Sequence, residues 1–261
     1  MTIDYSKQTT LVTGASAGIG VEFARELARR GSDLVLVARR KERLDALAAE
    51  LRLAHGITVT VIPLDLSEPG AGSAILEEAT RRGVTITSLI NNAGFGTQGP
   101  FHSEEGARLA DEIAVNVASL VDISRTFIEP LRASGSGFLV NVASMISYFP
   151  SPRMAVYGGT KAFVLSFTEA LWYESRESGL RVLSVAPGAT QTEFFDVAGP
   201  AAASGATLQP PIGVVRTTMR ALDARRSRPS VVVGRGNALA ASALRLFTRR
   251  AVVNIAGRIT A

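Results

Sequence analysis

Short apolar runs alternate along the chain with longer segments whose apolar positions repeat at helical spacing. The apolar runs cover 10–13, 34–38, 59–64, 88–91, 137–143, 181–186 and 230–233. The helical segments between them cover 18–30, 41–55, 71–82, 108–134, 155–178 and 212–224. Runs of Val, Leu and Ile separated by crossover helices are typical of a parallel sheet that is buried on both faces. The pattern therefore predicts an α/β fold with one doubly wound parallel sheet.

The composition favours a single domain over residues 1–261. A chain of this length with 46% hydrophobic residues can bury a large core. The stretch 198–211 is rich in Gly, Ala and Pro, so we expect a mobile substrate loop over about 195–212.

The net charge of +5 belongs to the C-terminal part of the chain. Residues 213–261 carry ten arginines and one acid, whereas residues 1–212 hold 18 basic and 22 acidic residues. Residues 236–261 form a basic amphipathic tail that could be helical over 237–258. Such a helix could contact an anionic membrane surface, or pack on the body or on a partner subunit, and packing is favoured. Nucleic-acid binding is disfavoured because the tail lacks lysine and interleaved aromatic residues.

The residue inventory excludes several kinds of site. The chain has no cysteine, which excludes disulfides, thiolate nucleophiles and cysteine-bound metal. The two histidines, His55 and His102, lie far apart in sequence, so we expect surface positions and neither a metal site nor a Ser-His-Asp triad. The N-terminus lacks the apolar core of a signal peptide, and no apolar run approaches the length of a membrane span. A soluble cytoplasmic protein is expected.

Tyr157 and Lys161 are four residues apart, which places both side chains on one face of a helix. A phenol with a reference pKa of about 10 exchanges protons poorly near neutral pH. An ammonium about 5 Å away would favour the phenolate by on the order of 3 kcal/mol at an effective dielectric near 20. We therefore expect Lys161 to lower the pKa of Tyr157. The chain has only three lysines against 25 arginines, so a lysine at this position is informative.

A glycine-rich turn follows the first apolar run. Gly14, Gly18 and Gly20 lie between that run and an amphipathic helix, the context that a dinucleotide-binding fingerprint requires. The glycines let the backbone approach a pyrophosphate at the helix N-terminus. The Gly-x3-Gly-x-Gly spacing differs from the commoner Gly-x-Gly-x2-Gly. The motif alone leaves an ordinary βα turn open.

Polar and turn-forming residues also follow later strands, where ligands bind in doubly wound sheets. These groups are Asp65-Leu66, Asn91-Asn92-Ala93-Gly94, Asn141-Val142-Ala143-Ser144 and Pro187-Gly188-Ala189-Thr190-Gln191-Thr192. Each could be turn chemistry alone, but several at successive strand ends predict one ligand site.

Together these motifs resemble the short-chain dehydrogenase/reductase family over about residues 8–195. The resemblance implies a Rossmann-type domain that transfers hydride between NAD(P) and a carbonyl/alcohol pair. It implies that Tyr157 is the general acid/base and that Lys161 lowers its pKa and holds the nicotinamide ribose. It also implies that Ser144 binds the substrate oxygen and that Asn116 supports a proton relay. The cofactor contacts then expected are Gly14, Ser16, Ala17, Gly18, Ile19, Gly20, Arg39, Arg40, Asp65, Leu66, Asn92, Ala93, Gly94, Tyr157, Lys161, Pro187, Gly188, Thr190 and Thr192.

The chemistry of these residues agrees with that expectation. Hydride addition to a carbonyl leaves negative charge on oxygen, which needs a proton donor and a polarising hydrogen bond. Tyr157 and Ser144 supply both, and the nicotinamide supplies the redox chemistry, so no metal is expected. Two simpler interpretations stay open: Ser144 as a strand-end cap, and Asn116 as a buried helix asparagine.

The end of the second strand bears on the choice of cofactor. Asp33 begins that strand, roughly 16–20 Å from its far end, too far for a carboxylate to reach a ribose there. Arg39 and Arg40 follow the strand, and arginine pairs with the 2′-phosphate of NADP. Ala17 lacks the basic side chain that some NADP-dependent relatives carry in the glycine turn. NADP(H) is therefore favoured over NAD(H).

The substrate is less defined by the sequence. A lipophilic ketone, aldehyde or alcohol is favoured because apolar residues flank the catalytic positions, although each could pack in the core. These residues are Phe95, Met145, Tyr148, Phe149 and Phe194. The resemblance implies a homo-oligomer, a dimer or tetramer, in which Phe167 and Trp172 could lie at a contact or pack in the core. Alternatives are an NADP-binding sensor without turnover, and an epimerase or dehydratase that uses the cofactor transiently.

Overall fold

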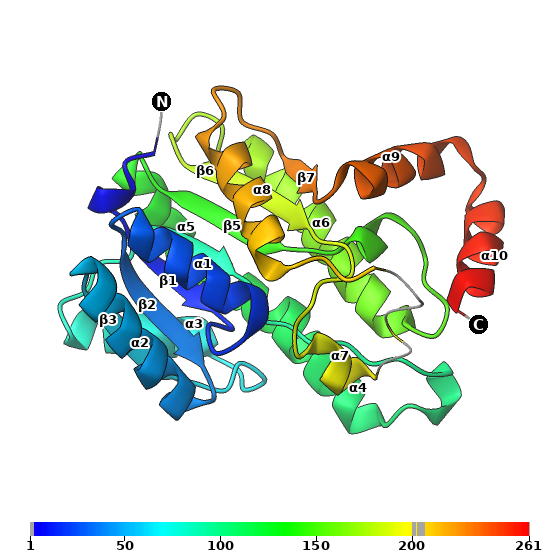
Figure 1. Cartoon of the computed structure of the whole chain (residues 1–261), viewed down its shortest axis with the longest axis horizontal. Helices are drawn as coiled ribbons and strands as arrows, with labels where there is room; N and C mark the ends of the chain where they lie inside the picture. The colour runs from blue at the N-terminus through cyan, green and yellow to red at the C-terminus, as the bar shows by residue number, and fades with distance from the viewer. Residues whose placement is uncertain (1–2, 200–201, 203–206, 261) are drawn as a thin grey trace.

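One parallel sheet forms the centre of the molecule (Figure 1). The computed structural model describes residues 3–199, 202 and 207–260. Within that part, the strand order is β3-β2-β1-β4-β5-β6-β7. The strands are β1 (Thr9–Thr13), β2 (Asp33–Ala38), β3 (Val59–Pro63), β4 (Ser88–Asn91), β5 (Phe138–Val142), β6 (Arg181–Ala186) and β7 (Ser230–Val232). The predicted doubly wound parallel sheet is confirmed.

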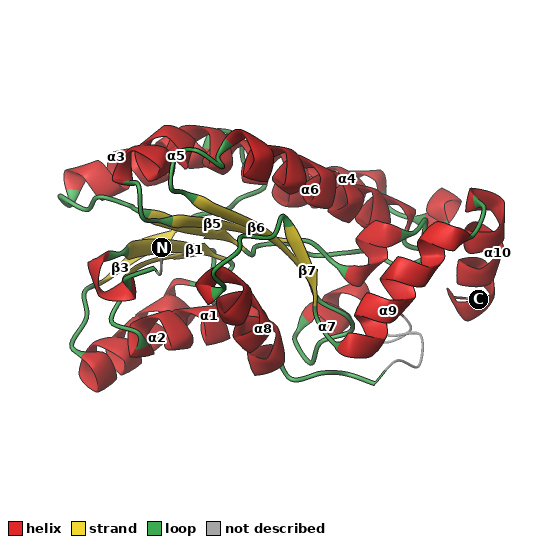
Figure 2. Cartoon of the chain, turned by 90° about the horizontal axis from the view of Figure 1, so that it is seen from above, coloured by secondary structure: helices red, strands yellow, loops and turns green. Residues whose placement is uncertain are grey.

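Helices cover both faces of the sheet (Figure 2). One face is covered by α1 (Gly18–Arg29), α2 (Lys41–His55) and α8 (Pro211–Asp223), and the other by α3 (Ala71–Arg81), α5 (Leu120–Ser134) and α6 (Ala155–Glu174). Phe23 and Leu44 belong to the core on the first face, whereas Ile75 and Phe127 belong to the core on the second. Burial on both faces is the reason that the strands are apolar almost without interruption.

The winding of the sheet reverses between β1 and β4. β1 pairs with β2 on one side and with β4 on the other, so Leu11 has Val35 and Leu89 as its register partners. The connections after β1 and β4 therefore leave the sheet in opposite directions and open a crevice at the carboxyl ends of these strands. The glycine turn after β1 and the Asn92 turn after β4 meet there: a Cβ atom on Gly14 would lie 2.8 Å from Asn92 Nδ2.

The segment predicted as one helix over 108–134 contains three parts. They are α4 (Gly106–Ile113), a π-helical segment over Ala114–Ser119, and α5. Such π-helical insertions occur mostly as single turns inside α-helices and often at functional sites. Asn116 lies in this segment and is fully buried.

The C-terminal tail also breaks where one helix was expected over 237–258. It forms α9 (Arg235–Ala243) and α10 (Arg249–Thr260), separated by a 3-10 turn over Leu244–Leu246, and both helices lie beyond β7 (Figure 1). Val252 and Ala256 of α10 are buried, whereas Leu246 and Phe247 at the break are 86% and 54% exposed. The tail packs on the body through both helices, since Ala241 of α9 is buried as well and α9 contacts β7.

The start of the expected substrate loop and two aromatic residues of α6 have defined places in the structure. α7 (Phe194–Ala198) occupies the start of the expected substrate loop, and residues 200–201 and 203–206 of that loop lie outside the described residues. Phe167 and Trp172 pack against buried core clusters, and Trp172 Nε1 donates to Ser227 Oγ at 2.9 Å.

Both histidines are exposed, as expected. None of the described helices is long and apolar enough to cross a membrane.

A close contact between α3 and α5 gives a test of the packing. A Cβ atom on Gly72 would lie 2.3 Å from Thr126 Oγ1 and 2.9 Å from the Asp122 carbonyl oxygen. We expect Gly72→Ala to lower the free energy of unfolding by about 1–3 kcal/mol, because the helices must move apart. Thermal denaturation would measure this as a fall in Tm of roughly 2–4 °C for each kcal/mol.

Gly213→Ala on α8 is the matched control, because nothing lies within 4 Å of the added methyl group. This variant should be as stable as the wild type, or more stable by up to about 1 kcal/mol. If Gly72→Ala melted at or above the wild-type temperature, the described α3–α5 contact would be wrong.

Candidate functional site

The carboxyl ends of β1, β4, β5 and β6 surround a cleft of about 490 Å³, a size typical of ligand sites. Most predicted site residues line it: Gly14, Ala17, Gly18, Ile19, Arg39, Asn92, Ala93, Gly94, Ser144, Tyr157, Lys161, Pro187, Gly188, Thr190 and Thr192. Predicted residues outside that lining are Ser16, Gly20, Arg40, Asp65, Leu66 and Asn116. The structure therefore gathers five separate sequence motifs at one place.

The glycine turn has the backbone geometry that an anion site needs. Gly14 and Gly18 have φ angles of 66° and 55°, in the left-handed region that favours glycine. Ala17, the N-cap of α1, makes no side-chain capping hydrogen bond, so N–H groups of the first turn stay available to a pyrophosphate. Gly20 supports the turn from behind, because a Cβ atom there would lie 2.2 Å from the Gly14 carbonyl oxygen.

Arginines gather where β2 ends, beside the glycine turn. The Arg40 guanidinium donates to Ser16 Oγ at 3.0 and 3.1 Å, and it pairs with Glu193 Oε2 at 2.7 Å. Hydrogen bonds from Arg43 and then Arg40 hold the pKa of Glu193 below its ordinary value. Glu193 follows β6, so this ion pair joins the two sides of the cleft. The sequence motifs gave no indication of Arg43 or Glu193.

Asp65 and Leu66 lie beside this arginine cluster at the end of β3. Asp65 Oδ1 accepts hydrogen bonds from the Ser67 backbone and hydroxyl, and Asp65 Oδ2 lies 3.7 Å from Arg39 Nη1. The Ser67 backbone bond is the main cause that lowers the pKa of Asp65. Leu66 is buried in the core. Their predicted contact with a cofactor stays a prediction.

Lys161 lines the cleft, but its amine is buried. The side chain is only 4% exposed, and Nζ donates to the Val142 carbonyl oxygen at 2.9 Å. Nζ lies 5.9 Å from the centroid of the Tyr157 ring. Burial lowers the pKa of Lys161 to about 8, because a charged amine loses solvation when it leaves water.

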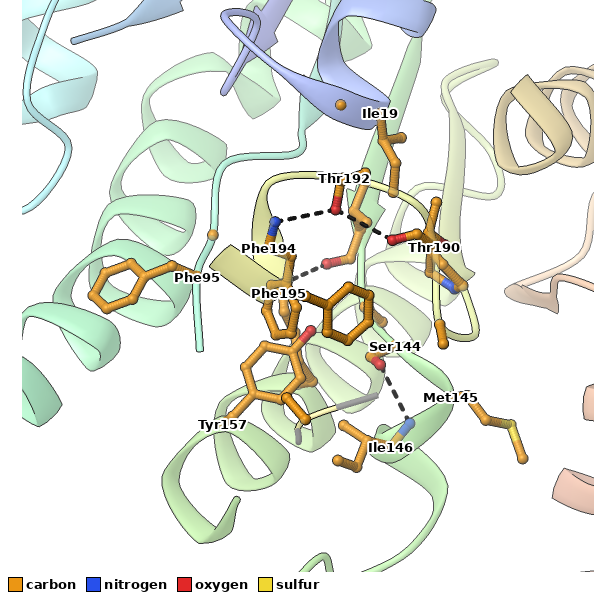
Figure 3. Close-up of a pocket in the computed structure, with 18 of the residues that line it drawn as sticks. Ile19, Phe95, Ser144, Met145, Ile146, Tyr157, Thr190, Thr192, Phe194 and Phe195 are labelled. Carbon is orange, nitrogen blue, oxygen red and sulfur yellow. Dashed lines mark hydrogen bonds between the residues drawn. The ribbon is translucent and has the colours of Figure 1, made fainter. Parts of the chain in front are cut away.

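Tyr157 faces the cleft from the first turn of α6, and its hydroxyl lies on the side facing Ser144 (Figure 3). The ring packs 5.1 Å from the ring of Phe194, centroid to centroid. Burial raises the pKa of Tyr157 above its ordinary value, and a hydrogen bond to Ser144 opposes this only in part. The expectation of a lowered pKa is therefore wrong for this arrangement, since loss of solvation outweighs the Ser144 hydrogen bond. The structure favours a neutral phenol, which can donate a proton.

Ser144 is a cap at the end of β5, and its binding of a substrate oxygen stays a prediction. It caps the 3-10 helix Met145–Tyr148, with Oγ accepting from Ile146 N at 3.3 Å and its own N–H donating to Ser147 Oγ at 3.2 Å. It also lines the cleft. Because the cap uses Oγ only as an acceptor, the hydroxyl can still donate to a ligand.

Asn116 holds the loop that follows β4. Its Oδ1 accepts from Phe95 N at 3.1 Å, and its Nδ2 donates to Phe95 O at 2.8 Å and to Thr160 Oγ1 at 3.1 Å. The buried-asparagine interpretation describes these contacts. A role in a proton relay stays a prediction.

The remainder of the cleft is mainly apolar. Its apolar walls include Phe95, Met145, Ile146, Phe149, Met154, Phe194, Phe195, Val197 and Ala256. Tyr148, expected there, instead packs against a core cluster beside α6. Asn237 and Ala256 of the tail also line the cleft. The sequence could not indicate these two, because they reach the site only through the tertiary placement of α9 and α10.

The buried lysine predicts a pH dependence of stability. The pKa of Lys161 falls from the ordinary 10.5 to about 8 in the folded state. Between these values the unfolded chain binds one more proton here, so the free energy of unfolding rises with pH. Relative to Lys161→Met, the wild type should gain on the order of 2 kcal/mol between about pH 8 and about pH 10. Urea denaturation at several pH values measures this difference.

Lys41→Met, at an exposed position on α2, is the matched control. Its free energy of unfolding should run parallel to that of the wild type over the same pH range. A constant difference between the wild type and Lys161→Met would contradict the described burial of the amine.

Comparisons with known proteins agree with this geometry. A family model described as short chain dehydrogenase matches residues 8–202. Sulfoacetaldehyde reductase 2 of Chromohalobacter salexigens is 36% identical over 186 residues, which make up 70% of this chain and 73% of that reductase.

Two solved structures are similar over nearly the whole chain. One, from work on 7β-hydroxysteroid dehydrogenase stereoselectivity, has a TM-score of 0.85 at 26% identity and covers 98% of this chain and 99% of the other. The second is a short-chain dehydrogenase from Sphingobium yanoikuyae in complex with NADPH, with a TM-score of 0.78 at 36% identity. That match covers 92% of this chain and 94% of the other.

Proposed function

The chain belongs to the short-chain dehydrogenase family, and on that basis we propose that it interconverts lipophilic ketones or aldehydes and their alcohols with NADP(H). The observation that carries this proposal is the position of Tyr157 and Ser144. Both line the cleft, between the glycine turn and the apolar walls. A carbonyl oxygen beside these two hydroxyl groups would meet a proton donor and a polarising hydrogen bond together.

In the proposed reduction, this chain moves the proton and stabilises charge. A nicotinamide held in the cleft would supply the hydride. Ser144 donates a hydrogen bond to the carbonyl oxygen, which makes the carbon more electrophilic. Tyr157, neutral because of its burial, gives its proton to the oxygen as negative charge develops there. The Lys161 ammonium then stabilises the phenolate, and alcohol oxidation follows the same steps in reverse.

The proposed cofactor contacts lie at two places, the glycine turn after β1 and the arginines after β2. The N–H groups at the start of α1, which the Ala17 side chain does not cap, suit the pyrophosphate. Arg39 and Arg40 suit the 2′-phosphate of NADP(H), because guanidinium forms paired hydrogen bonds with phosphate. Arg40 has five N–H donors and uses three of them on Ser16 and Glu193, so two are left for a phosphate. The similar structure that contains NADPH supports this preference.

The proposed substrate class rests on the walls of the cleft. Phe149 and Met154, at the two ends of the loop before α6, and Ala256 of α10 line the cleft with apolar surface. Such walls favour a substrate that loses little solvation when it binds. The likeness to a structure of a 7β-hydroxysteroid dehydrogenase supports a bulky lipophilic substrate.

Tyr157→Phe tests the proton donor. We expect the turnover number to fall by about 10²–10⁴-fold, because the ring stays in place but the proton is lost. The Kd for NADPH should stay within about threefold of the wild-type value, since the other expected contacts with the cofactor are kept. NADPH absorbance measures turnover, and fluorescence titration measures binding.

Tyr173→Phe, the same change at an exposed position on α6, is the matched control and should keep wild-type turnover. If Tyr157→Phe reduced ketones at the wild-type rate, Tyr157 would not be the proton donor. A sensor without turnover would show no NADPH consumption even in the wild type.

Arg40→Gln tests the cofactor preference. Loss of a charged hydrogen-bond partner of the 2′-phosphate should lower kcat/KM with NADPH by about 10–100-fold. The value with NADH should change by less than about threefold, because NADH has no phosphate at that position. Arg81→Gln, on the exposed side of α3, is the control for loss of an arginine elsewhere. A clear preference of the wild type for NADH would overturn the proposed cofactor.

A further inference from the structure

A buried carboxyl lies below the proposed active site, and no step of the proposed reaction uses it. Glu112, in the last turn of α4, is 0% exposed. Its Oε2 accepts a hydrogen bond from Thr97 Oγ1 at 2.9 Å. Its Oε1 is also buried and has no hydrogen-bond partner among the described residues. A buried carboxyl with an unpaired oxygen lowers stability, so stability alone does not account for it.

Glu112 holds the far end of the loop that Asn116 also holds. Asn116, four residues later, bonds the backbone of Phe95, and Glu112 bonds the side chain of Thr97 two residues further along. The loop after β4 is therefore attached at two points to the helical segment beneath it. A substitution at Glu112 can therefore alter the environment of the residues that this loop contacts.

The loop packs directly on the proposed acid/base pair. A Cβ atom on Gly94 would lie 3.1 Å from Lys161 Nζ, and a Cβ atom on Gly96 would lie 2.8 Å from Cδ2 of Tyr157. α4, which carries Glu112, also packs against α6, which carries the pair. The carboxyl and the amine thus share one interior region, separated by a loop without bulky side chains at its contact points.

The charges in this region act on one another. Burial raises the pKa of Glu112, the bond from Thr97 lowers it, and Glu104 and Lys161 act on it with opposite signs. In return, Glu112 opposes the burial that lowers the pKa of Lys161, and it adds to the rise in the pKa of Tyr157. Glu112 is thus the carboxyl whose charge favours the protonated amine.

We propose that Glu112 is the counter-charge of Lys161, a positioning residue that keeps the amine protonated and anchors the loop above it. This inference rests on the proposed function, in which Lys161 must be cationic to stabilise the phenolate. Without the carboxylate, the amine would lose its proton at lower pH. A structural anchor alone would hold Thr97 but would leave the protonation of Lys161 unchanged.

Glu112→Gln separates these two roles, because the amide can still accept the Thr97 hydrogen bond but carries no charge. The ionisation of Lys161 can be followed directly by NMR of ¹³Cε-labelled lysine, since the chain has only Lys7, Lys41 and Lys161. The Lys161 resonance is the one missing from Lys161→Met. We expect Glu112→Gln to lower the pKa of Lys161 by about one unit.

Glu104→Gln is the matched control. The charge of Glu104 raises the pKa of Glu112. The pKa of Lys161, in contrast, is shifted by burial and by Glu112. The pKa of Lys161 should therefore stay within about 0.3 units of the wild-type value in this variant. If Glu112→Gln did not fold, Glu112→Met would give the same comparison with an uncharged side chain of similar size.

The pH dependence of activity gives a second readout, which should shift in the same direction as the pKa of Lys161. The alkaline limb of kcat/KM for ketone reduction should move to lower pH in Glu112→Gln by the shift seen in NMR. An unchanged pKa of Lys161 in a folded, uncharged variant would overturn the counter-charge role, whatever the activity. A lowered pKa in a protein that never oxidises NADPH would confirm the counter-charge and contradict only the proposed function.

Discussion

A lysine amine almost fully removed from water is the constraint on which the site depends. Burial removes water from around the charged amine of Lys161, and a hydrogen bond to the Val142 carbonyl replaces one of the lost bonds to water. The strand end that supplies this carbonyl also supplies Ser144, and the helix that carries the amine also carries Tyr157. The backbone that confines the amine therefore also sets the two hydroxyl groups on the cleft. The amine keeps a pKa near 8, low enough for small electrostatic changes to alter its charge at physiological pH.

Close backbone approach makes this arrangement possible. The glycine turn, the loop after β4 and the turn after β6 meet at distances that a Cβ atom would not fit: a Cβ on Gly18 would lie 2.8 Å from Thr192 Cγ2. The same closeness brings Arg40 across to Glu193. Sheet topology brings these turns together, because β1 and β4 are neighbours although 74 residues lie between the end of β1 at Thr13 and the start of β4 at Ser88. A site built on strand ends in this way takes its precision from the rigid sheet below it.

Sequence predicted the strands and most helices because burial on both faces imposes an apolar pattern that is visible without a structure. It also predicted the residues of the cleft that belong to glycine, asparagine and Tyr-Lys motifs. It did not predict the π-helical segment at Asn116, because no composition signal marks an extra residue within a helix. Ala256 and Glu193 were missed for a related reason: their place in the site depends on how α10 and the turn after β6 pack. The sign of the Tyr157 pKa shift was wrong because a spacing reveals the neighbouring charge but not the loss of water.

Hydride transfer to a carbonyl carbon beside Tyr157 can be followed by deuterium labelling. The wild-type protein would be incubated with a lipophilic ketone and NADPH that carries deuterium at both C4 positions of the nicotinamide. Mass spectrometry of the alcohol should then show one deuterium bound to the carbinol carbon, and it should not exchange with water. An alcohol without deuterium, or a reduced cofactor left unoxidised across a broad panel of ketones and aldehydes, would contradict the assignment of this cleft to hydride transfer.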